Sequence, residues 1–102
     1  MMRIAFIGPQ RKLIRFSIDG KIIRYFDDNW KGGIQIYPLS ISLVNKLVNA
    51  SSPNLKAMGL LIFDANNGTN LEEYNSCKTE EELANFIRKD CSLKGLSEVT
   101  KK

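Results

Sequence analysis

Residues Leu13 to Phe26 read LIRFSI, then DG, then KIIRYF, and this stretch decides the fold. Asp19-Gly20 between two runs of β-branched and aromatic residues is a strong hairpin signal. A two-residue type I′ turn needs positive φ at both central positions, and glycine supplies one of them without strain. Counting outward from that turn predicts that Arg15 faces Arg24 across the hairpin.

The alternation of side chains divides this hairpin into two faces. The apolar face, suited to a core, comprises Ile14, Phe16, Ile18, Ile23 and Tyr25. The other face carries Arg15 and Arg24 side by side. Like charges directly opposite each other are destabilising by up to about 1 kcal/mol unless an anionic group lies over them. This face is therefore the candidate binding surface, the alternative being that Asp27 or Asp28 neutralises the pair from within the chain.

Further strands are expected on both sides of the hairpin. Short β-rich runs cover residues 3–7 and 34–37, and each is ended by a proline-containing turn. Residues 59–63 form a continuous apolar run of strand length, which is typical of a strand covered on both faces. We interpret that run as the central strand.

Two helices are expected after the hairpin. In the first, apolar residues recur at helical spacing after Ser40, which is a suitable N-cap. The second is an amphipathic segment that begins after a capping box formed by Thr79 and Glu82 and ends at Gly95. The element order predicts an α+β fold, with a mostly antiparallel sheet of about five strands and two helices packed on one face. Residues 1–96 are expected to form a single domain and residues 97–102 a polar C-terminal tail.

Composition limits the compartment and the class of protein. The 102 residues are 43% hydrophobic and 25% charged, as in an ordinary globular domain, and no apolar run approaches the roughly 20 residues of a membrane-spanning helix. The N-terminus lacks the layout of a signal peptide. Histidine is absent, and Cys77 and Cys91 form no CxxC motif, which argues against a zinc site or a disulfide framework. We expect a protein that is cytoplasmic or part of a virion, is not secreted and does not bind membranes.

The net charge of +4 is concentrated at the N-terminal end. Residues 1–31 hold seven basic and three acidic side chains, whereas the rest of the chain is balanced, and four of the five arginines fall within the first 24 residues. Arginine forks onto phosphate or carboxylate groups. Basic side chains along a sheet also keep it from aggregating, so solvation of the sheet is the structural alternative to a binding role.

The motifs of catalysis and of cofactor binding are incomplete. Gly8 stands alone where a dinucleotide site needs three spaced glycines, and the loop that begins at Asp64 lacks the glycine position and the final glutamate of a calcium site. Without histidine, an activated thiol would depend on a helix N-terminus, which Cys77 precedes. A small buried or half-buried thiol is the simpler interpretation. We expect no enzymatic activity, no metal and no cofactor.

These observations favour a protein that works by contact. The hypothesis is a small accessory or structural subunit of a macromolecular assembly, such as a phage or viral virion, that docks on protein partners through its basic sheet face. The expected partner-binding residues are Arg11, Lys12, Arg15, Arg24 and Trp30. The alternative is a regulatory protein that binds nucleic acid through the same face, with salt-dependent phosphate contacts and base stacking. The oligomeric state is left open.

Overall fold

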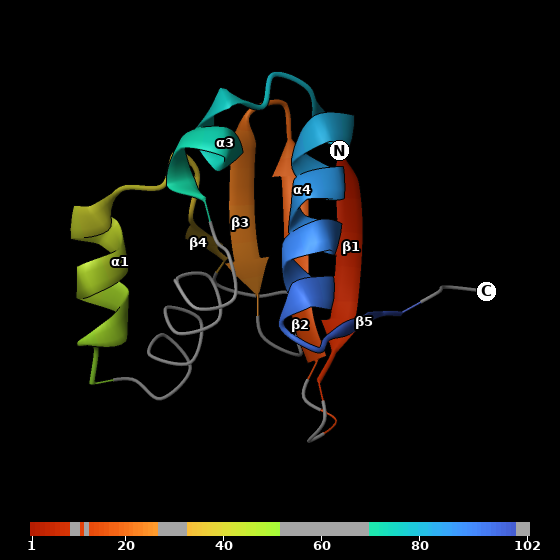
Figure 1. The fold of residues 1–102 in the computed structure, drawn as a ribbon, viewed down its shortest axis with the longest axis horizontal. Coiled ribbons are helices and arrows are strands. Elements are labelled where there is room, and N and C mark those ends of the chain that lie inside the picture. The colour runs from red at the N-terminus through yellow and green to blue at the C-terminus, as the bar shows by residue number, and fades with distance from the viewer. Residues whose placement is uncertain (9–10, 12, 27–32, 52–69, 100–102) are drawn as a thin grey trace.

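The computed structural model describes residues 1–8, 11, 13–26, 33–51 and 70–99. Within these residues the chain forms an α+β fold around a five-stranded antiparallel sheet of order β4-β3-β2-β1-β5 (Figure 1), which confirms the predicted fold class. The strands are β1 (Met2–Ile7), β2 (Leu13–Asp19), β3 (Ile22–Phe26), β4 (Ile34–Gln35) and β5 (Ser97–Glu98). The helices are α1 (Ile41–Val48), α3 (Leu71–Ser76) and α4 (Glu80–Leu93).

The hairpin between β2 and β3 forms where the sequence predicts it, but its register differs by two residues. Asp19 pairs with Ile22, Ser17 with Arg24 and Arg15 with Phe26, so Arg15 does not lie opposite Arg24 as expected. The loop is Gly20-Lys21, and Gly20 has a φ of 62° at the first loop position, where a type II′ turn places glycine. In this turn Asp19 stays in the strand and needs no positive φ. A shift of two residues leaves every side chain on its predicted face.

The apolar face of the sheet is covered by α4, which lies across β1 and β2 (Figure 1). Phe16 packs edge-on against both Phe6 and Tyr25, with ring centroids 6.1 and 5.9 Å away. From α4, Leu83 and Ile87 are buried in the same core. This face of the sheet is packed in the core, and the arginines project from the opposite face.

Local sequence signals begin and end α4 as expected. The Thr79 side chain accepts a hydrogen bond from the Glu82 backbone N–H at 3.1 Å. The Glu82 carboxylate reaches back to the Lys78 N–H at 3.3 Å and the Thr79 hydroxyl at 3.2 Å, so the capping interaction is reciprocal. At the other end Gly95, with φ of 82°, lets the Leu96 N–H return to the Cys91 carbonyl at 2.9 Å. This is the Schellman arrangement that stops a helix.

The turn of the hairpin is tied to the start of α4. The Gly20 N–H donates to Glu80 Oε2 at 2.7 Å across 60 residues of sequence. A second long-range link joins the segment after β4 to α3. There the Asn75 side chain accepts from the Leu39 N–H at 2.9 Å and donates to the Leu39 carbonyl at 2.7 Å, while the Tyr37 hydroxyl donates to the Asn75 carbonyl at 3.0 Å. These bonds satisfy backbone groups outside regular strands.

The fifth strand of the described sheet comes from the C-terminal end of the chain. Residues 97–102 are expected to be a polar tail, yet Ser97 and Glu98 pair with Ile7 and Phe6 of β1 as strand β5. The predicted central strand at 59–63 lies outside the described residues, and β2 occupies the middle of the described sheet. Among the described helices, none has the length and apolar character to cross a bilayer.

Candidate functional site

The face of the sheet opposite α4 carries three arginines from three neighbouring strands. Arg3 of β1 and Arg24 of β3 both pair with Ser17 of β2, one on each side. Arg15 lies two residues before Ser17 on the same strand and projects from the same face. We name this surface the arginine face. By the alternation of the paired strands it comprises the residues Arg3, Ala5, Ile7, Leu13, Arg15, Ser17, Asp19, Ile22, Arg24, Phe26 and Gln35, so one carboxylate shares the face with the three arginines.

The register interleaves the arginines instead of opposing them. Arg15 has Ala5 and Phe26 as its cross-strand partners, so no two arginines occupy a directly opposed pair. The Cα atoms of Arg3 and Arg24 are separated by two strand spacings, roughly 10 Å. This arrangement avoids the like-charge penalty that the expected pairing of Arg15 with Arg24 would carry.

Small and long side chains alternate across the arginine face. Ser17 is buried, at 7% exposure, between the exposed Arg3 and Arg24. Ser17 therefore lies between two strand positions that carry arginines, and arginine side chains bind carboxylates readily.

The β3 side of this face is organised around Gly33. The Arg24 guanidinium donates to the Gly33 carbonyl at 3.3 Å through Nη1. A Cβ at Gly33 would approach the Phe26 ring to 2.5 Å, so the ring lies directly against the glycine backbone. The missing side chain at Gly33 therefore allows Phe26 to cover the edge of the sheet, while Arg24 is held over the start of β4.

Of the other predicted binding residues, Arg11 is the one that the structure describes. It is exposed before the start of β2, with φ of 61°, and its N–H donates to the Gly8 carbonyl at 2.9 Å. Lys12 and Trp30 lie outside the described residues. The interpretation from sequence missed Arg3 and Ser17. Pairing the strands on either side of residues 8–12 could have found them, because Ile7 opposite Leu13 places Arg3 opposite Ser17.

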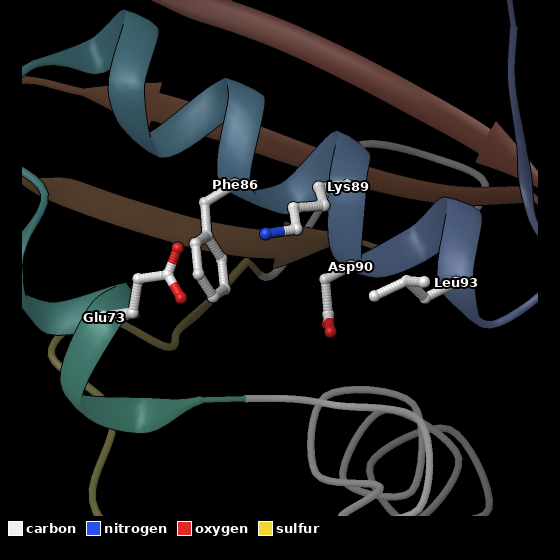
Figure 2. A pocket seen from close by; sticks show the side chains of 5 residues that line it. All are labelled: Glu73, Phe86, Lys89, Asp90 and Leu93. Atoms are coloured by element: carbon white, nitrogen blue, oxygen red, sulfur yellow. The ribbon is translucent and has the colours of Figure 1, made fainter.

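A second surface feature lies between α3 and α4, on the helical side of the molecule. It is an open groove of about 360 Å³, lined by Glu73, Ser76, Cys77, Glu82, Asn85, Phe86 and Lys89. Figure 2 shows the adjoining hollow, in which Glu73 projects from α3 and Phe86 and Lys89 project from α4. The Phe86 ring packs edge-on against the buried Tyr74, with centroids 5.0 Å apart.

The electrostatics of this groove oppose an activated thiol. Cys77 follows α3 as its C-cap residue, and its thiol contacts the Glu73 carbonyl at 3.6 Å. Burial raises the pKa of the Cys77 thiol, and the Glu82 and Glu73 carboxylates raise it further. Burial also raises the pKa of Cys91, to about 12. Neither environment favours the thiolate that a nucleophile requires.

Cys77 is expected to react with iodoacetamide more slowly than free cysteine at about pH 8, because its raised pKa leaves less thiolate. The rate is measured by intact mass spectrometry on the folded protein, in which the buried Cys91 reacts far more slowly. Glu73→Gln removes one of the carboxylates and is expected to increase the rate. Alkylation of Cys77 as fast as that of free cysteine would show instead that its thiol is activated.

The part of the chain that the structure describes brings together no three cysteine or acidic side chains able to hold a metal ion. In comparisons with known proteins, the chain matches no family model, no curated protein and no solved structure. The arginine face and the groove are therefore the features that bear on function.

Proposed function

We propose that this protein is a non-enzymatic accessory subunit of a macromolecular assembly and that it docks through the arginine face on an acidic surface of a protein partner. The observation that carries the proposal is that Arg3, Arg15 and Arg24 lie on neighbouring strands around Ser17, on the side of the sheet opposite α4. Strands hold binding groups more rigidly than loops, and interfaces are enriched in arginine. A virion is one assembly that would use such a subunit.

The composition of the arginine face favours a protein partner over nucleic acid. Proteins that bind single strands without sequence preference stack successive bases on aromatic side chains. Of the aromatic residues in the described strands, Phe26 alone projects from this face, and its ring lies against Gly33. The aliphatic members of the face, such as Ile22, suit the packed centre of a protein interface better than a stacking platform.

Arg24→Glu is expected to weaken binding to poly-L-glutamate, a probe of acidic polypeptide, by about tenfold or more at low salt. The change removes one charge-assisted contact and adds a repulsive carboxylate, and tenfold corresponds to about 1.4 kcal/mol. Binding is measured by fluorescence anisotropy. Lys46→Glu is the matched control, because Lys46 is exposed on α1 and the change in net charge is the same.

Two results would contradict the proposal. Equal losses for Arg24→Glu and Lys46→Glu would mean that binding follows net charge and not the arginine face. Tighter binding to a labelled thymidine oligonucleotide than to poly-L-glutamate, with log affinity falling linearly with log salt, would favour the nucleic-acid alternative.

A further inference from the structure

The groove between α3 and α4 has the chemistry to receive a guanidinium group. Glu73 and Glu82 contribute carboxylates from the two helices, and Phe86 lines the groove with them. Burial raises the pKa of the neighbouring Cys77 thiol, and both carboxylates raise it further. Among the described lining residues the two carboxylates outnumber the one cation, Lys89, and Glu72 is another exposed carboxylate on α3.

Arginine fits this lining better than lysine does. Its planar guanidinium stacks on an aromatic ring while its edge donates to carboxylates, and both kinds of partner are present in the groove. The half-buried Phe86 is held by its edge-on packing against Tyr74, so the ring is a fixed platform. The open volume of about 360 Å³ is within the range of sites that take a side chain or a small ligand.

The groove and the arginine face lie on opposite sides of the molecule. The arginine face projects away from α4, whereas the groove is formed by α3 and α4 on the other side of the sheet. Two arginine faces brought together would repel each other, since each carries three arginines and one carboxylate, that of Asp19. A contact between the arginine face of one copy and the groove of the next is complementary in charge.

We propose that the protein partner is a second copy of this chain, joined head to tail, with Arg24 of one copy over Phe86 and between Glu73 and Glu82 of the next. The inference rests on the proposed docking function of the arginine face. A head-to-tail contact uses two different surfaces, so it repeats from copy to copy and builds a closed ring or an open filament. The assembly to which the subunit belongs would then consist of copies of the chain itself.

The test is sedimentation velocity over a range of protein concentrations at low salt, using charge reversals on the two surfaces. The wild-type protein is expected to associate with increasing concentration. Arg24→Glu alone and Glu73→Lys alone are each expected to weaken association by about tenfold or more. Glu73 is chosen because its hydrogen bonds with Asn70, Ser76 and Cys77 use its backbone atoms. Circular dichroism checks that each variant is folded.

Recombination of the variants separates a specific contact from an effect of net charge. An equimolar mixture of the two variants is expected to regain association, because Arg24 of one chain meets the intact Glu73 of the other. The double variant, which carries both reversals in one chain, is expected to associate with itself. Lys46→Glu has no place in the contact and is expected to associate like the wild type.

The outcomes distinguish this inference from the proposed function. A wild-type protein that stays monomeric at its highest soluble concentration overturns the head-to-tail contact, as does association that neither reversal weakens. Failure of the mixture to associate also overturns it. In each of these cases, docking on a different acidic protein would still be supported if Arg24→Glu, unlike Lys46→Glu, lost binding to poly-L-glutamate. If the head-to-tail contact is overturned and Arg24→Glu shows no such selective loss, the proposed function of the arginine face is contradicted as well.

Discussion

Replacing Lys94 with methionine is expected to lower the free energy of unfolding by about 3–5 kcal/mol. Lys94 Nζ lies 2.8 Å from Asp90 Oδ2, and the two side chains are only 5% and 10% exposed. Removal of the ammonium takes a cation away from the Asp90 carboxylate, which little water reaches. Removing one member of a buried ion pair costs far more than breaking an ion pair on the surface, whose contribution is about 0–1 kcal/mol. The loss is a large part of the 5–15 kcal/mol that typically stabilises a domain.

Urea unfolding followed by circular dichroism measures this effect. Lys89→Met is the matched control, because Lys89 is exposed on the same helix and its replacement is expected to change stability by no more than about 0.5 kcal/mol. In the double variant Asp90→Asn with Lys94→Met, the charge left behind is removed, and much of the lost stability is expected to return. Equal effects of Lys94→Met and Lys89→Met would mean that the ion pair is exposed to solvent.

The sequence could not have predicted that this ion pair is buried. Asp90 and Lys94 are four residues apart on α4, a spacing that is typical of ion pairs on exposed helix faces. Their burial depends on what packs around the end of the helix, where Gly95 reverses the chain and brings Leu96 back toward Cys91. Such packing joins segments that no local pattern connects.

Features set by neighbouring residues were predicted well. The period-two alternation around residues 13–26 gave the two faces of the hairpin, and Ser40, Thr79 and Gly95 marked helix boundaries that the structure confirms. The register was wrong because two turn types compete for a two-residue loop. A type I′ turn would centre on Asp19-Gly20, whereas the observed loop begins at Gly20, so that glycine alone takes the positive φ at that position.

The candidate site was predicted only in part, because most of it is non-local. Arg15 and Arg24 share a face as the alternation requires, but Arg3 joins them through the pairing of β1 with β2. The groove depends on the packing of α3 against α4, and no sequence motif indicates it. Strand β5 likewise forms from residues whose polar composition is typical of a tail.

Phe16→Ala is expected to lower the free energy of unfolding by about 3–5 kcal/mol, comparable to the loss of the buried ion pair. Phe16 is 2% exposed in the middle strand, and its ring packs edge-on against Phe6 on one side and Tyr25 on the other. Truncation leaves a cavity and removes two aromatic contacts, each worth about 0.5–1.5 kcal/mol beyond the buried area. Thermal unfolding followed by circular dichroism measures the change. Leu13→Ala, at a half-buried position of the same strand, is the control and is expected to cost about 1 kcal/mol.

The Phe16→Ala variant also tests whether packing in the core sets the positions of the arginines on the opposite face of the sheet. Strand β2 alternates between the two, since Phe16 points into the core while Arg15 and Ser17 point to the other side. If the sheet holds the arginines through its backbone, then Phe16→Ala binds poly-L-glutamate like the wild type at temperatures where it stays folded. Its binding is then lost together with its structure on heating, whereas Arg24→Glu loses binding while fully folded. Weak binding by a fully folded Phe16→Ala protein would contradict this, because it would mean that core packing sets the positions of the arginines.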